Sequence, residues 1–132
     1  MFPSAKHTPP PTVKVYRGNT ATISFPDLKF NSEDKTSILY GESILFIVKS
    51  PMGTTVLSKT LTGVEGEELP IQFDLIPEDT VELCAPFKYH FSLDLYNSEN
   101  NQTDFYTLQR GDFILMDGVG TIYDIETPEE GE

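Results

Sequence analysis

The chain has 132 residues, 38% of them hydrophobic, which allows one domain whose core needs no metal or disulfide. Its formal net charge of −12, from 9 basic and 21 acidic residues, argues against DNA or RNA as a partner, because affinity for phosphates comes largely from Lys and Arg. The single Cys84 excludes an intramolecular disulfide and a cysteine zinc site, and favours maturation in a reducing cytosol.

Residues 1–12 are predicted to form a proline-rich arm. Pro9, Pro10 and Pro11 fix the backbone angle φ, lack an amide donor and favour extended polyproline geometry. Such a segment cannot join a central strand, but it can lie along another subunit. The N-terminus has no apolar signal-peptide core, and the longest apolar run, residues 44–48, is too short to span a bilayer. We therefore expect no membrane partner.

Alternation of apolar and polar residues predicts the first strands. Val13 and Val15, and then residues 20–25, alternate in the way typical of a strand with one buried face, interrupted at residues 17–19. A polar loop is expected at residues 31–37.

A β-hairpin is predicted next. Residues 42–50 contain the continuous apolar run at 44–48, which is typical of a strand covered on both faces. Pro-Met-Gly at 51–53 predicts a turn, and residues 54–61 form the returning strand. In residues 69–75 the alternation resumes, with Ile71, Phe73 and Leu75 on one side.

One short helix is expected over residues 77–83. Pro77 suits the first helical position, and Glu78 and Asp79 suit the positive end of the helix dipole. At about two turns it is a connector between strands. Cys84 follows it and is expected to be a small buried apolar side chain.

Residues 87–96 are the clearest strand, with its apolar face on alternate residues from Phe87. The polar face carries His90, Ser92 and Asp94, the residue types of a hydrolase triad. Successive members along one strand are about 6.6 Å apart, too far for the hydrogen bonds that a triad needs. We therefore expect a solvent-exposed polar face and no catalytic residue.

Arg110-Gly111-Asp112 spells the tripeptide that integrins bind on some extracellular proteins. Its context is a strand, one glycine and another strand, which is typical of a tight turn because glycine adopts positive φ. Cell adhesion would need an extracellular protein with an extended exposed loop. The sequence therefore predicts a turn here and not an adhesion site.

Seven or eight short strands with one connector helix predict an all-β, antiparallel β-sandwich over residues 13–116. Residues 117–132 carry six acidic residues and no basic one. This acidic tail is either a solvated segment or one that docks on a basic patch of a neighbouring protein.

Three stretches carry a resemblance to a known family: VYRGNTATISF, GESILFIVKSPMGTTVLSKTL and LPIQFDLIPEDTVELCAPFKYHFSLDLYNSENNQTDFYTLQRGDFIL. Over residues 15–116 the chain resembles the N-terminal domain of the phage baseplate upper protein family and, more broadly, the immunoglobulin-like modules of tailed-phage virions. CAPFKY at 84–89 departs from the family, where a Pro-Gly pair precedes the aromatic strand. The long stem of baseplate upper proteins is also missing from this sequence.

The resemblance implies an immunoglobulin-like sandwich and a non-enzymatic virion structural protein, assembled in the host cytoplasm. Its expected partners are other virion proteins and copies of itself, with no cofactor, metal or small-molecule ligand. The candidate assembly contacts are Pro9, Pro10, Pro11, Tyr96, Tyr123, Glu129 and Glu130. The alternative is a carbohydrate- or receptor-binding surface module that uses exposed tyrosines, although the chain has no tryptophan.

Overall fold

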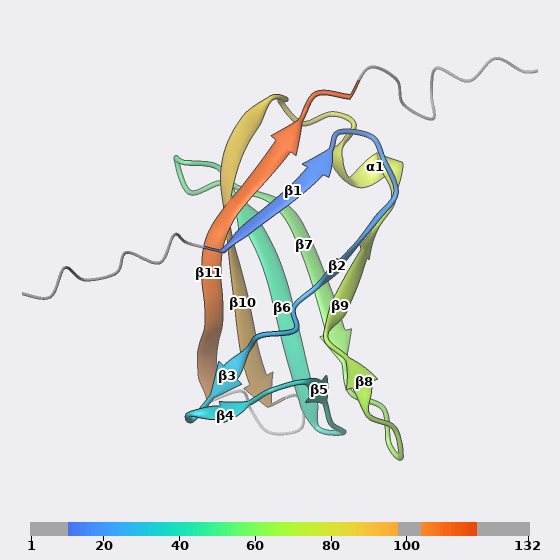
Figure 1. Cartoon of the computed structure of the whole chain (residues 1–132), viewed down its shortest axis with the longest axis vertical. Helices are drawn as coiled ribbons and strands as arrows, with labels where there is room; N and C mark the ends of the chain where they lie inside the picture. Colours follow the sequence, from blue (N-terminus) through green and yellow to red (C-terminus); the bar gives the residue numbers. More distant parts are fainter. Residues whose placement is uncertain (1–10, 98–103, 119–132) are drawn as a thin grey trace, which may run out of the picture.

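The computed structural model describes residues 11–97 and 104–118, and the regular structure of these residues is nearly all β (Figure 1). The larger layer is a five-stranded sheet in the order β1-β11-β10-β6-β7. The bounds of these strands are Thr12–Tyr16 for β1, Phe105–Met116 for β11, Phe87–Asn97 for β10, Glu42–Lys49 for β6 and Thr55–Thr62 for β7.

The second layer is built on the antiparallel pair of β2 (Ala21–Ser24) and β9 (Gln72–Leu75), which lies on one side of the larger sheet (Figure 1). Two short antiparallel pairs flank it. They are β3 (Lys29–Phe30) with β4 (Glu33–Asp34), and β5 (Ser37–Ile38) with β8 (Leu69–Pro70). The predicted all-β, sandwich-like architecture is confirmed.

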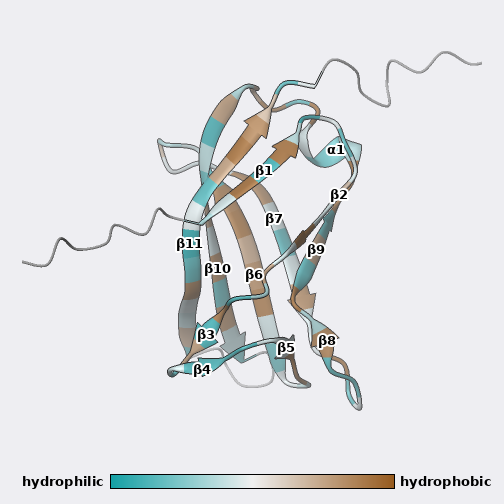
Figure 2. Ribbon diagram, viewed as in Figure 1, coloured by the Kyte–Doolittle hydropathy of each residue, from teal (hydrophilic) through white to brown (hydrophobic). Residues whose placement is uncertain are grey.

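The core lies between the two layers and is rich in phenylalanine. Phe25, Phe46, Phe73 and Phe91 form a cluster with ring centroids 5.4–6.2 Å apart. Apolar and polar residues alternate along the strands (Figure 2), so each strand turns one set of side chains inward. The inward side chains that the alternation predicted in residues 69–75 are buried, as are those of residues 89–95. Phe87, which was predicted on the same face, is 39% exposed, so the prediction is wrong at the first residue of this strand.

The predicted hairpin is also confirmed. β6 and β7 are antiparallel neighbours, and the Ser50 amide donates to the Thr54 carbonyl across the turn at 2.8 Å. Gly53 has a φ of 92°, a conformation that other residues rarely adopt. The glycine therefore allows the chain to reverse in so few residues.

Two connections differ from the sequence-based expectation. The polar loop at 31–37 contains β4 and the start of β5, because Asn31 and Ser32 adopt positive φ and close a tight turn after β3. The helix α1 spans only Pro77–Thr80. After it the chain continues as a turn, in which the Leu83 amide donates to the Thr80 carbonyl at 2.9 Å.

The first and last strands of the described chain are neighbours, and they run parallel. This pair is the exception among the strand pairs of the described chain, since the others are antiparallel as predicted. Pro11 and Thr12, which the sequence assigned to the arm, contact this edge: the Asp112 amide donates to the Pro11 carbonyl at 2.9 Å. Proline has no backbone N–H to donate, but Pro11 can lie at this edge because only its carbonyl oxygen takes part in the hydrogen bond.

Candidate binding face

The side of the five-stranded sheet that faces away from the core forms an open concavity of about 820 Å³ on β6, β10 and β11. We call this side the outer face. Its floor is apolar, with Leu45 and Ile47 half-buried on β6. The polar side chains that surround this floor are Lys49, His90, Ser92, Asp94, Thr107, Arg110 and Asp112. An apolar floor with a polar surround is typical of a surface that binds a partner or a ligand.

Asp94 is a buried carboxylate in this face, with 6% of its surface exposed. Its Oδ1 accepts hydrogen bonds from the Ser92 hydroxyl at 2.8 Å and from the Thr107 hydroxyl at 2.9 Å. The register of β10 against β11 shifts between Leu93 and Asp94, so that Thr107 stands opposite Asp94. The expectation of a solvent-exposed polar face is wrong at Asp94, because the two hydroxyls take the place of water.

His90 does not join Ser92 and Asp94 in a triad-like chain. Its Nδ1 lies 3.8 Å from Oδ1 of Asp112, on the neighbouring strand. Ser92 donates instead to Asp94. The spacing argument is therefore wrong for Ser92 and Asp94, which hydrogen-bond across two residues, whereas His90 contacts the neighbouring strand instead.

The basic residues of the described chain fall into two groups. Those of the first group each form an ion pair with a carboxylate at 3.4 Å or less, and they are Arg17, Lys29, Lys35 and Lys59. Those of the second group lie on the outer side of β1, β6, β10 and β11, and we call them the basic patch: Lys14, Lys49, Lys88 and Arg110.

The cations of the basic patch are poorly compensated. Within residues 11–97 and 104–118, Lys14, Lys49 and Arg110 form no ion pair. Lys88 approaches only Asp112, at 3.8 Å, and shares it with His90. The whole chain carries a net charge of −12, so the positive charge of this patch contrasts with the acidic character of the protein as a whole.

The prediction of a turn at Arg110-Gly111-Asp112 is wrong. All three residues lie inside β11, where Gly111 pairs with Phe91 of β10. The glycine is needed for a close backbone approach: a Cβ atom there would lie 2.2 Å from the Pro11 carbonyl oxygen and 2.9 Å from Cε2 of Phe91. The tripeptide is thus part of a sheet, where Arg110 and Asp112 point to the outer face.

An aromatic cluster lies where β10 ends and β11 begins. Tyr96 stacks on Phe105 with ring centroids 6.0 Å apart and planes 13° apart, while Tyr106 meets Phe30 edge-on at 5.2 Å. A hollow of about 160 Å³ lies beside it, lined in part by Phe30, Tyr96 and Tyr106. Tyr96, a predicted assembly contact, is half-buried here, whereas Phe105 and Tyr106 are exposed.

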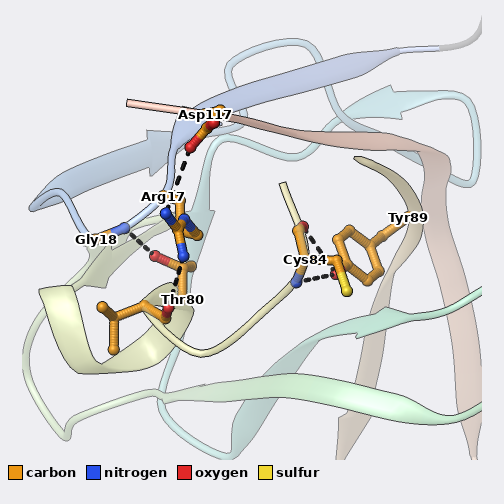
Figure 3. A network of polar contacts seen from close by, with 7 residues as sticks. Arg17, Gly18, Thr80, Cys84, Tyr89 and Asp117 are labelled. Carbon is orange, nitrogen blue, oxygen red and sulfur yellow. Dashed lines mark hydrogen bonds and ion pairs between the residues drawn. The ribbon is translucent and has the colours of Figure 1, made fainter. Parts of the chain in front are cut away.

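The end of the sandwich near α1 is held by a polar network (Figure 3). Arg17 donates to the Val81 carbonyl at 3.3 Å and pairs with Asp117 at 3.4 Å. The Gly18 amide donates to the hydroxyl of Thr80, which is fully buried, at 2.7 Å. This network ties the turn after β1 and the residue after β11 to the connector between the two layers.

Tyr89 and Cys84 make a second contact at this end (Figure 3). The Tyr89 hydroxyl donates to the Cys84 carbonyl and accepts from the Cys84 amide, both at 3.1 Å. Burial raises the pKa of Tyr89 above its ordinary value of 10.0, and the backbone hydrogen bond opposes this shift. Cys84 itself is exposed, so its predicted burial is wrong: only its backbone takes part in the contact.

Several sequence-based predictions concern residues outside the described part of the chain. Pro9, Pro10, Tyr123, Glu129 and Glu130 all lie there. Among the residues that the structure describes, no three histidine, cysteine or acidic side chains gather in a group that could hold a metal ion. In the same residues, no helix has the length and apolar character needed to cross a bilayer.

Comparison of the chain with protein-family models, with curated proteins and with solved structures finds no match.

Proposed function

We propose that this chain is a non-enzymatic structural protein of a tailed-phage virion, and that it assembles with its neighbours through the outer face. The observation that carries the proposal is the basic patch around an apolar floor. Unpaired cations on this face are not needed for the stability of the fold. They are needed if the face binds an acidic neighbour, because they then supply the opposite charge. The chain is then a rigid block that other virion proteins, or copies of itself, bind.

Two features support the immunoglobulin-like topology that the resemblance implies. The first strand runs parallel to the last at one edge of the larger sheet, and β2 pairs with β9 in the other layer. Tyr89, near the start of β10, makes hydrogen bonds to the backbone five residues upstream. This contact is like the tyrosine corner of immunoglobulin-type sandwiches, in which a tyrosine hydroxyl bonds the backbone a few residues earlier.

Cross-linking of intact particles tests the proposal. Phage particles are purified from cells that express the chain from its own gene, treated with a lysine-reactive cross-linker and analysed by mass spectrometry. Cross-links from Lys49 and Lys88 to other virion chains are expected, with Lys29 of the separate β3–β4 pair as the internal control. Absence of the chain from purified particles would overturn the proposal.

The aromatic cluster favours a second candidate, recognition of a carbohydrate on a surface. Tyr106 is exposed at the hollow of about 160 Å³ and Phe105 is exposed at the concavity of the outer face, and exposed aromatic rings suit stacking on sugar rings. Titration of the chain with glycans, followed by chemical shifts, separates the candidates. Saturable shifts that disappear in Phe105→Ala and Tyr106→Ala support carbohydrate binding, and their absence supports assembly.

A further inference from the structure

We infer that the basic patch binds the acidic residues 119–132 of a second copy of this chain. The inference rests on the proposed function, since it takes the outer face as an assembly surface and names its occupant. The contact that it assigns joins two different surfaces of one protein, so each copy offers one patch and one acidic segment.

Charge complementarity is the first argument. Residues 119–132 contain five acidic side chains and no basic one: Asp124, Glu126, Glu129, Glu130 and Glu132. The basic patch offers four cations, of which three have no ion pair among the described residues. Opposite charges of nearly equal number favour association, and they give it a strong dependence on salt.

The dimensions also agree. Lys14 and Lys49 lie on strands three steps apart in the sheet, which corresponds to about 14 Å. An extended chain advances about 3.3 Å per residue, so the stretch from Asp124 to Glu129 spans about 17 Å. One acidic segment can therefore cross the whole patch.

The floor of the outer face provides the third argument. Leu45 and Ile47 lie between the cations, and the described residues leave them only half-buried. The acidic segment contains its own apolar residues, Ile122, Tyr123 and Ile125, directly before and among its acids. Burial of these side chains against the floor would add a favourable term that charge alone does not supply.

The place where the chain leaves the sheet favours a second copy over the same one. Asp117 pairs with Arg17, and Arg17 also binds the carbonyl of Val81 in the connector after α1 (Figure 3). The alternation along β11 places Asp117 on the side of the buried Leu115, opposite to the outer face. The Asp117 side chain, the last charged group before the segment, thus points away from its own basic patch.

Sedimentation velocity of the full-length chain tests the inference. Because patch and segment differ, their contact is head-to-tail, and the average mass should rise steadily with protein concentration. The association should weaken about tenfold or more when salt reduces the Debye length from about 10 Å towards 3 Å. A full-length chain that stays monomeric at all concentrations overturns the inference.

Two full-length variants sharpen the test. The patch variant carries Lys49→Glu and Arg110→Glu. The segment variant carries the neutralising changes Asp124→Asn, Glu126→Gln, Glu129→Gln, Glu130→Gln and Glu132→Gln. Each variant alone should remain monomeric, whereas their mixture should form dimers and nothing larger, because only one patch and one segment remain intact. Lys29→Glu, an exposed lysine away from the patch, should associate like the wild type.

The outcomes show separately whether the outer face is an assembly surface and whether residues 119–132 occupy it. If the patch variant is monomeric but the segment variant still associates, the outer face is an assembly surface and the occupant is wrong. The alternative is that the segment binds the patch of its own chain. In that case the protein is a monomer, and salt changes the chemical shifts of Lys49 and Arg110 equally at every protein concentration. This result overturns the inference. Cross-linking of particles tests the proposed function independently of either result.

Discussion

The inner and outer faces of β6, β10 and β11 are made by alternate residues of the same strands, yet they obey different constraints. On the inner face Phe46, Phe91 and Phe113 are at most 2% exposed, and the Phe46 ring contacts the other two. On the outer face Lys49 and Arg110 are exposed without an ion pair among the described residues. The inner face is determined by packing, whereas the outer face retains charges that packing does not explain.

Replacement of an inner-face phenylalanine should have the largest effect on stability. Phe46→Ala removes a ring with no exposed surface from the centre of the cluster and leaves a cavity, which should cost about 3–5 kcal/mol in the free energy of unfolding. Ile47→Ala, its half-buried neighbour on the outer face, should cost clearly less. Urea unfolding of both variants measures the difference, and equal losses would contradict the contrast between the faces.

Addition of one carbon at Gly111 should have an intermediate effect on the stability of the fold. The new Cβ of Gly111→Ala would overlap the Pro11 carbonyl, which belongs to the backbone and cannot rotate away, at a cost of about 1–3 kcal/mol. We expect β1 to detach first, so the Asp112 amide that donates to Pro11 should exchange faster with solvent. Arg110→Ala should change stability by less than about 0.5 kcal/mol. Unchanged exchange at Asp112 in Gly111→Ala would contradict the expected overlap.

The removal of one hydroxyl should have the smallest effect. Tyr89→Phe loses two hydrogen bonds to Cys84 and should cost about 1 kcal/mol near neutral pH. Burial raises the pKa of Tyr89 in the folded state, so the folded protein holds this proton more tightly than the unfolded chain. The resulting stabilisation is complete below pH 10.0 and is lost as pH rises from there through the folded pKa.

Alkaline urea titrations of wild type and Tyr89→Phe should therefore converge above pH 10.0. Other tyrosines and lysines titrate in the same range, so the difference between the two proteins is the relevant quantity. A difference that stays constant through this range would show that the hydroxyl has the same pKa in both states.

The inner face was predictable from the sequence, because period-two alternation reports which side chains leave water. The strands around Phe73 and Phe91 were placed correctly for this reason. The outer face was not predictable, because neither the burial of Asp94 nor the shared contact at Asp112 follows from local spacing. Both depend on which strands become neighbours and in which register, and the bulge beside Asp94 leaves no mark in the alternation.

Gly111 was misinterpreted for a related reason. A glycine between two polar residues is typical of a turn, but it also permits a distant segment to come close. The segment in question, Pro11, lies far away in sequence, so local sequence reasoning did not include it. The same tertiary information decides that Cys84 is exposed even though it follows an apolar residue.

Because β1 pairs with β11, the larger sheet can be completed only late in the synthesis of the protein. Residues about a hundred positions apart meet in this pair and in the contact between Arg17 and Asp117. During synthesis the first strand leaves the ribosome long before its neighbour has been translated, and it has to wait without a partner in the sheet. The sandwich therefore closes only after the last strand has emerged from the exit tunnel.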